Sequence, residues 1–154
     1  MTGTPRPDSR RSAGLLLPLF SIASSQSWGI GEFADLPILA RWMDGAGLRV
    51  LQVLPLNEMA PGQASPYSAA SAMALDPIFI AVPEVPDFRE LGGEDALDTA
   101  ARGLLEHARA SRAVDYWGVR TLKDRALRSA FRRFLRHEWV PGSARARGLR
   151  AFIR

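Results

Sequence analysis

Val50-Leu-Gln-Val-Leu-Pro-Leu56, followed by Ser65-Pro-Tyr-Ser-Ala-Ala-Ser-Ala-Met-Ala-Leu-Asp-Pro77, is the part of the sequence that indicates how the chain folds. The first segment is almost continuously apolar and ends at a proline, as expected of a strand buried on both faces. The second is a long loop of mostly small residues with one tyrosine, Tyr67. A loop of this kind after a strand end is typical of a binding surface built on a rigid scaffold.

The segments on either side of this strand predict an α/β fold. Leu15–Leu19 is a short apolar run that we expect to form a first strand, and apolar residues recur every three or four positions over Asp35–Met43, which predicts a helix. With Val50–Leu54 as the second strand, the order is strand, helix, strand, which predicts a parallel unit with a right-handed crossover. Ile78–Val82 is expected to form a further strand.

The C-terminal half of the chain is predicted to be helical. Glu94–Arg109 reads as one weakly amphipathic segment, and a longer helix with an apolar stripe at 3.6-residue spacing follows it. The stripe consists of Val119, Leu122, Ala126, Leu127, Ala130, Phe131 and Phe134. We expect this stripe to lie in the core, together with Trp42, Met43 and Trp139.

Composition excludes several kinds of site. The chain has no cysteine, which rules out disulfides and thiolate chemistry, and with only His107 and His137 we expect no metal site. No apolar run approaches the roughly 20 residues that span a bilayer, so we expect no membrane association. The lack of cysteine favours a reducing compartment, and we expect the protein to be cytoplasmic.

The first apolar run has a second interpretation. Arg10 and Arg11 precede Ala13–Ile22, and small residues follow at Ala23–Ser25, which is the outline of a secretory signal. A strand here is awkward because Pro18 removes a backbone donor. The pattern alone leaves both interpretations open.

The net charge of +4 is unevenly distributed. Residues 1–95 carry 6 Arg and 11 acidic residues, a net of −5, whereas residues 96–154 carry 13 Arg, one Lys and 5 acidic residues, a net of +9. A basic helix can bind nucleic acid. However, Arg125, Arg128 and Arg132 fall opposite the apolar stripe, as on an ordinary helix that packs on a core. We therefore expect no nucleic-acid partner, and a basic nucleic-acid-binding module is the least favoured alternative.

The acidic residues and the glycine loop do not form a recognisable site. Trp28-Gly-Ile-Gly31 lacks the third glycine of a dinucleotide fingerprint, and Glu32 directly after it would repel a phosphate. We expect Asp35 and Asp44 to be solvated charges on the first helix, and Asp76, which precedes a proline, to cap a turn. Glycoside cleavage needs two opposed carboxyl groups about 5 to 9.5 Å apart, and nothing in the sequence pairs two of them.

Tyr67 has two interpretations. Sugar rings expose apolar faces, so an aromatic side chain among hydroxyl donors suits sugar recognition. Taken on its own, however, one tyrosine in a loop is better explained as a structural residue.

Blocks of sequence between Arg11 and Lys123 point to a known family. They are Arg11-Ser-Ala-Gly-Leu-Leu-Leu-Pro18, Trp28-Gly-Ile-Gly-Glu-Phe33, Gln52-Val-Leu-Pro-Leu56, Ser65-Pro-Tyr67, Ser71-Ala-Met-Ala-Leu-Asp-Pro77 and Val114-Asp-Tyr-Trp-Gly-Val-Arg-Thr-Leu-Lys123. In this order and spacing they resemble the 4-α-glucanotransferases, the amylomaltase or disproportionating-enzyme family. The resemblance covers residues 11–154 but only about the first third of a family member.

The resemblance implies a fold and a set of substrate contacts. The chain would be an incomplete N-terminal part of a (β/α)₈ TIM barrel, with residues 1–12 as a disordered lead-in, 13–88 as the first strands, helix and substrate-side loop, and 89–154 as a helical inserted subdomain. Residues that match the family's donor-glucan contacts are Ser65, Pro66 and Tyr67, and those that shape the same rim are Trp28, Gly29 and Gly31.

The resemblance also implies a chemistry. The family transfers α-1,4-glucan segments to glucose or another glucan by a retaining mechanism that uses three carboxylates and needs no cofactor. None of the carboxylates in this chain matches those motifs, so we assign no catalytic residue and expect the isolated chain to be inactive. A complementary C-terminal chain could supply the missing part. The alternative is a glucan-binding remnant without catalysis.

Overall fold

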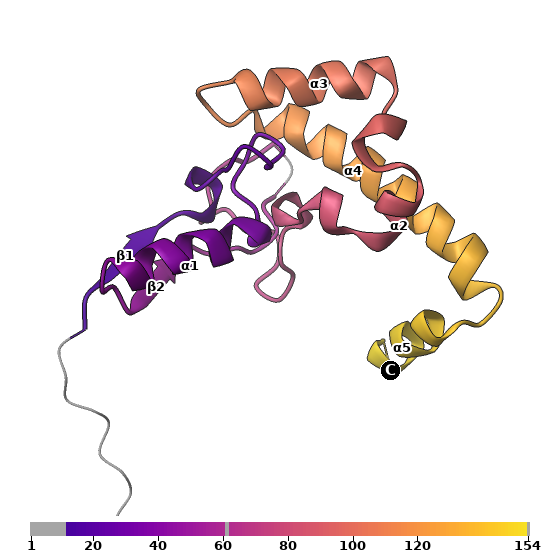
Figure 1. Ribbon diagram of the computed structural model, residues 1–154, viewed down its shortest axis with the longest axis horizontal. Coiled ribbons are helices and arrows are strands. Elements are labelled where there is room, and N and C mark those ends of the chain that lie inside the picture. The colour runs from indigo at the N-terminus through magenta and orange to yellow at the C-terminus, as the bar shows by residue number, and fades with distance from the viewer. Residues whose placement is uncertain (1–11, 61, 154) are drawn as a thin grey trace, which may run out of the picture.

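The computed structural model describes residues 12–60 and 62–153. Strands β1 (Gly14–Leu17) and β2 (Val50–Val53) lie parallel, with Gly14 opposite Val50 and Leu17 opposite Val53. Helix α1 (Leu36–Gly45) connects them (Figure 1). This arrangement confirms the predicted βαβ unit and the α/β class. Apart from Ser12, the predicted lead-in lies outside the described residues.

The first strand is shorter than predicted because of Pro18. The sequence indicated a strand over Leu15–Leu19, but β1 ends at Leu17 and the chain then forms a 3₁₀ turn over Leu19–Ser21. Proline has no backbone N–H to donate to a neighbouring strand, so the ladder ends there. The strand interpretation of this apolar run therefore holds for its first part.

The prediction of a strand over Ile78–Val82 is wrong. The chain forms two 3₁₀ turns instead, Pro77–Phe79 and Val82–Glu84. Each turn has a proline in its first positions, where the fixed φ of the ring favours a helical turn. The carbonyl groups of Ile78 and Ile80 accept hydrogen bonds from the Lys123 ammonium, so their polar groups are satisfied without a neighbouring strand.

The rest of the described chain is helical, but the first predicted helical segment is divided. A 3₁₀ turn at Gly93–Ala96 precedes the first long helix, so Glu94–Arg109 is not one segment. The side chain of Asp98 accepts a hydrogen bond from the Ala101 amide and caps the helix there. The helices are α2 (Pro86–Glu90), α3 (Thr99–Ala110), α4 (Tyr116–Phe134), a π-helical turn (Leu135–Trp139) and α5 (Ala144–Phe152).

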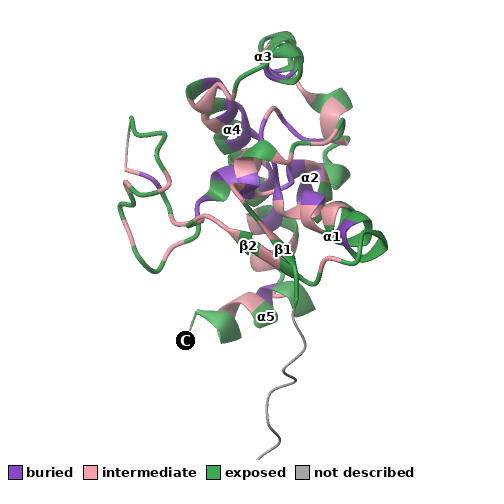
Figure 2. Ribbon diagram, turned by 90° about the vertical axis from the view of Figure 1, so that its left-hand side faces the viewer, coloured by how far each residue is buried: buried purple, intermediate pink, exposed green. Residues whose placement is uncertain are grey.

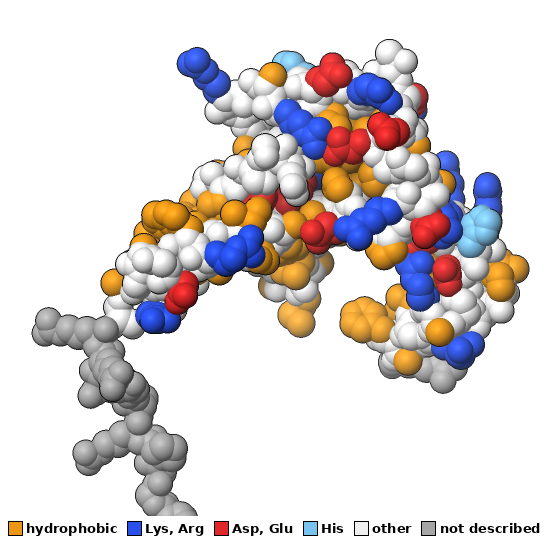
Figure 3. Space-filling model, viewed as in Figure 1, with side chains coloured by type: hydrophobic (Ala, Val, Ile, Leu, Met, Phe, Trp, Pro, Cys, Tyr) orange, Lys and Arg blue, Asp and Glu red, His pale blue; other side chains and the backbone are white. Residues whose placement is uncertain are grey.

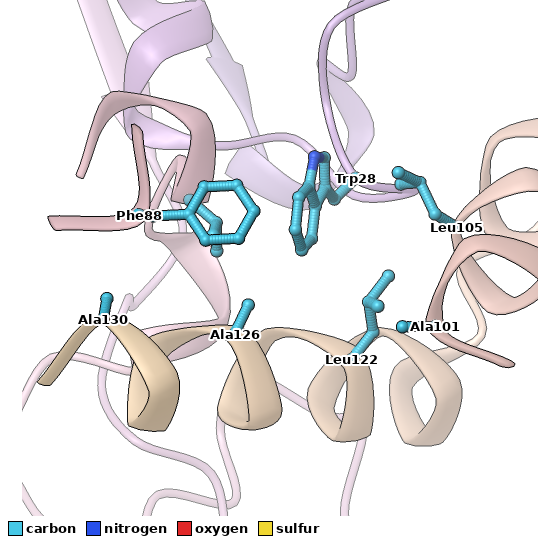
Figure 4. Packing of buried hydrophobic residues seen from close by; sticks show 8 residues of the cluster. Trp28, Phe88, Ala101, Leu105, Leu122, Ala126 and Ala130 are labelled. Carbon is cyan, nitrogen blue, oxygen red and sulfur yellow. The ribbon is translucent and has the colours of Figure 1, made fainter. Parts of the chain in front are cut away.

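Two hydrophobic clusters form the core, and both join the N-terminal segments to α4. In the first, the Trp28 ring packs edge-on against Phe88, 5.6 Å between ring centres, over Leu122 and Ala126 of α4 (Figure 4). Figure 2 shows the buried residues concentrated where α2 and α4 meet the loops around them. Members of the second cluster are Leu19, Ile30, Met59, Ile78, Phe79, Ala108 and Val119.

Some residues predicted to be in the core are exposed. Met43 is buried as predicted, but the Trp42 side chain on the next position of α1 is 60% exposed, and Phe131 on α4 is exposed too. Both lie where a helix surface has no covering element within the described residues. Figure 3 shows hydrophobic side chains on the surface around α1, β1 and β2, where Leu16 and Val50 are also exposed.

Candidate functional site

The loop over residues 57–75 follows β2 and stands away from the rest of the molecule, at the left of Figure 2. Its two arms are held together near the base by antiparallel pairing of Asn57 with Leu75 and of Met59 with Ala69. Two backbone hydrogen bonds support this pairing. The Glu58 amide donates to the Ala74 carbonyl at 2.9 Å, and the Ala70 amide donates to the Glu58 carbonyl at 2.7 Å. The described residues of the loop therefore form a hairpin-like structure whose two arms are paired.

The predicted glucan contacts lie at the tip of this loop. The Tyr67 side chain is 72% exposed, Ser65 is exposed and Pro66 is half-buried. The Ser65 hydroxyl accepts a hydrogen bond from the Tyr67 amide. The backbone carbonyl of Ser65 accepts a second hydrogen bond, from the Ser68 amide at 3.0 Å. These bonds form a tight turn that directs the tyrosine ring into solvent, where an aromatic face is accessible to a sugar.

Asp76 anchors the base of the loop. Its side chain is fully buried and accepts hydrogen bonds from the Ile78 amide at 3.0 Å and the Met59 amide at 3.1 Å. Both terminal nitrogens of Arg120 donate to the same carboxylate, at 3.0 and 2.8 Å. Burial alone would raise the pKa of Asp76, but these hydrogen bonds and the guanidinium charge outweigh it and lower the pKa. The predicted turn cap is confirmed, whereas its partner on α4 was not predicted.

The second predicted segment, Trp28 to Gly31, is mostly buried. The Trp28 side chain is 0% exposed, and its indole Nε1 donates to Glu94 at 2.8 Å. Gly29 has φ +77°, and a Cβ at Gly31 would lie 1.9 Å from the Leu19 carbonyl oxygen, so both glycines are required by the close packing of this loop. Among the described residues, no hydrogen bond joins this segment to Ser65, Pro66 or Tyr67.

Glu32 holds this segment against α4. Its carboxylate accepts a hydrogen bond from the Trp28 amide at 3.1 Å and pairs with the Lys123 ammonium at 2.6 Å, with both side chains buried. Burial raises the pKa of Glu32 and lowers the pKa of Lys123, although the charge of each opposes the shift of the other. The ammonium also donates to the carbonyls of Ile78 and Ile80, at 2.6 and 2.9 Å, so all three of its hydrogens have acceptors.

The sequence carried one signal for this buried pair. Lys123 is the single lysine in a chain with 19 arginines. A compact ammonium can meet three acceptors in a small buried space, whereas a planar guanidinium cannot. A lone lysine at the end of the last matching block was therefore informative.

Asp35 differs from the prediction that it is a solvated charge. It is buried, and its carboxylate accepts hydrogen bonds from the Ser27 hydroxyl at 2.9 Å and from the Glu32 amide at 2.7 Å. It therefore caps the turn that leads into α1. Asp44 is exposed as predicted and pairs with Arg49 at 2.9 Å.

Most arginines of α4 are engaged within the chain. Arg120 pairs with Asp76, Arg128 with Asp124 at 2.6 Å, Arg133 with Asp87 at 2.9 Å, and Arg125 with Asp98. Figure 3 shows acidic and basic side chains next to each other over α3 and α4. This interleaving is typical of a solvated helix face and does not favour binding to a polyanion.

The described residues contain no group of three or more histidine, aspartate or glutamate side chains able to hold a metal ion. Within the same ranges, no helix is both long and apolar enough to cross a membrane.

The fold and the loop define a class of protein: an α/β scaffold that carries an exposed aromatic loop after the end of a parallel strand. The sequence pattern of one family, described as 4-alpha-glucanotransferase, matches residues 17–154. The chain therefore belongs to the 4-alpha-glucanotransferase family.

Individual relatives agree with this family. The chain is 34% identical to the 4-alpha-glucanotransferase of Chlamydia pneumoniae, over 78% of this chain and 22% of the relative. It is 32% identical to the 4-alpha-glucanotransferase DPE2 of Oryza sativa subsp. japonica, over 98% of this chain and 17% of the relative. The crystal structure of amylomaltase from Corynebacterium glutamicum superposes with a TM-score of 0.67 and 28% identity, over 78% of this chain and 18% of that one. The chain thus spans about a fifth of the length of these relatives.

Proposed function

We propose that this chain is the N-terminal part of a 4-alpha-glucanotransferase, which transfers α-1,4-glucan segments to glucose or another glucan. Its own contribution is to bind donor glucan through Ser65, Pro66 and Tyr67. The observation that carries the proposal is the exposed Tyr67 on an anchored loop, within a family match that covers residues 17–154. An exposed ring beside serine hydroxyls supplies the apolar face and the polar donors that a sugar requires.

We further propose that residues 13–88 are the start of an incomplete (β/α)₈ barrel and that residues 89–154 are a helical inserted subdomain. The exposed side chains of Leu16 and Val50 support this, because parallel strands are normally covered on both faces. A whole barrel needs about 250 residues, and a complementary C-terminal chain could supply the rest. We place the protein in the cytoplasm, in keeping with its lack of cysteine.

The proposed chemistry is retaining, with an aspartate nucleophile, a glutamate acid and a second aspartate, all outside this chain. Free carboxylates are required for such roles. In this chain Asp35 and Asp76 are buried and hydrogen-bonded to backbone amides, and Glu32 is paired with Lys123. Trp28, Gly29 and Gly31 contribute to the glucan rim through the position of their backbone, since the Trp28 ring is buried.

The purified 154-residue chain is expected to give no disproportionation of maltotriose above the buffer blank. The reason is that a retaining transfer needs two carboxyl groups about 5 Å apart across the scissile bond. The measurement is separation of the products after prolonged incubation, with an intact family amylomaltase as the positive control. Glucose and longer maltooligosaccharides formed by the chain alone would show that it holds its own catalytic carboxylates.

Replacement of Tyr67 with alanine is expected to weaken maltoheptaose binding by about tenfold, because stacking of a ring on a sugar face contributes on the order of 1–1.5 kcal/mol. Isothermal titration of the chain with maltoheptaose measures this. Met73→Ala is the matched control, since Met73 is an exposed apolar side chain on the same loop. Equal maltoheptaose affinities for Tyr67→Ala and the unmodified chain would show that Tyr67 does not contact the glucan.

A further inference from the structure

We propose that Arg120 is a positioning residue for glucan binding: from α4 it fixes the base of the 57–75 loop and so the place of Tyr67. Lys123 lies three residues further along the helix. Arg120 and Lys123 together attach the 57–75 loop and the Trp28–Gly31 segment to one turn of α4. This inference rests on the proposed glucan role of the loop.

The two segments are attached in the same way. In each, a buried carboxylate accepts hydrogen bonds from loop amides and pairs with a cation of α4. Asp76 accepts from the Met59 and Ile78 amides and pairs with Arg120, whereas Glu32 accepts from the Trp28 amide and pairs with Lys123. Because residues three apart on a helix lie on the same face, the two attachments share one surface of α4.

The attachment at Asp76 controls the loop because it joins both arms. Met59 lies on the outgoing arm and Asp76 directly follows the returning arm, so a single carboxylate holds the two ends of the loop in register. The Asp76 amide also donates to the Leu56 carbonyl at 2.9 Å. Among the described residues, no hydrogen bond joins residues 62–70 to the molecule outside the 57–75 loop, so the direction of Tyr67 depends on the geometry of the base.

The bidentate contact suits arginine in particular. Both terminal nitrogens of Arg120 lie within 3.0 Å of the two Asp76 oxygens, which fixes the plane of the carboxylate as well as its position. The Arg120 side chain is 39% exposed, so its removal opens no large cavity. Loss of Arg120 therefore leaves the buried Asp76 without its cation while the rest of the core stays packed.

The test compares Arg120→Ala with Arg120→Lys in the full 154-residue chain. Amide hydrogen exchange at Met59 and Ile78 is expected to rise about tenfold in Arg120→Ala, because a hydrogen bond to a charged group contributes about 1.5–3 kcal/mol and its loss favours local opening. Maltoheptaose affinity, measured by isothermal titration, is expected to fall about tenfold at the same time. Arg120→Lys keeps the positive charge but cannot make two parallel hydrogen bonds to the carboxylate. We therefore expect its amide exchange and its maltoheptaose affinity to lie between those of Arg120→Ala and the unmodified chain.

Two internal references accompany the test. Exchange at the Trp28 amide, which Glu32 and Lys123 hold, is expected to stay unchanged. Arg128→Ala removes a solvent-exposed pair on the same helix and is expected to change neither exchange nor affinity.

Each result decides between anchoring and direct contact. A fall in affinity without a change in exchange would mean that Arg120 touches the glucan itself, which overturns the proposal. Faster exchange with unchanged affinity would overturn it as well, because the loop base would then not govern binding. If the unmodified chain binds no maltoheptaose, the proposed function fails. The exchange data then still decide whether Arg120 anchors the loop: a rise at Met59 and Ile78 supports it and no change overturns it.

Discussion

Lys123→Met is expected to lower the free energy of unfolding by about 3–5 kcal/mol, the usual cost when one partner of a buried ion pair is removed. Methionine keeps the approximate length of the side chain but cannot donate a hydrogen bond. Glu32 would then be a buried carboxylate without its cation, and the carbonyls of Ile78 and Ile80 would lose their donor. Urea unfolding followed by tryptophan fluorescence measures the change.

The energy of the pair can be separated from the bulk of the side chain. In the double variant Lys123→Met with Glu32→Gln both charges are absent, and the glutamine oxygen can still accept from the Trp28 amide. We expect the double variant to be more stable than Lys123→Met alone, which a double-mutant cycle quantifies. Arg128→Met, on the exposed face of the same helix, is expected to be nearly neutral. An unfolding midpoint for Lys123→Met equal to that of Arg128→Met would show that the ammonium is not buried.

The local elements of this fold could be predicted from the sequence, because they depend on neighbouring residues. Apolar spacing over Asp35–Met43 and the run from Val50 predicted α1 and β2 to within two residues at each end. The turn cap at Asp76 followed from its place before a proline. Short-range patterns of this kind contain the information that a helix, a strand or a cap needs.

Errors arose where a distant residue decides the outcome. Ile78–Val82 has the composition of a strand, but Lys123, more than 40 positions away, satisfies its carbonyls and allows two 3₁₀ turns. Trp42 and Phe131 are apolar at helical positions and yet exposed, because no described element covers them. Whether an apolar residue is covered depends on tertiary packing, which periodicity does not contain.

In the candidate site, too, the features that depend on neighbouring residues could be predicted, whereas those that depend on distant residues could not. The family blocks led to Ser65, Pro66 and Tyr67, and all three lie on one exposed turn. By contrast, no local sequence pattern indicates that Arg120 and Lys123 hold the loops, since their partners Asp76 and Glu32 lie far away along the chain. Only the use of lysine in place of arginine at position 123 set one of them apart.

Trp28→Ala is expected to lower the free energy of unfolding by about 3–5 kcal/mol, as removal of a large buried ring does when the cavity cannot collapse. The indole is fully buried between Phe88 and Leu105, over α4 (Figure 4). Its loss would also leave Glu94 without the indole donor, although Arg109 still pairs with that carboxylate at 2.8 Å. Urea unfolding, with circular dichroism as the signal, measures the effect.

Two further variants separate the contribution of the Trp28 hydrogen bond from that of ring burial: Trp28→Phe and, as the exposed control, Trp42→Ala. Trp28→Phe retains most of the ring packing on Phe88 and loses the hydrogen bond to Glu94, so we expect a loss of about 1–3 kcal/mol. Trp42→Ala removes a ring of the same size from the surface and is expected to change stability by less than about 0.5 kcal/mol. If Trp28→Ala instead left stability intact and weakened only maltoheptaose binding, Trp28 would be a glucan contact on the rim. A large loss of stability means that Trp28 acts from the core, by holding the glycine loop against α3 and α4.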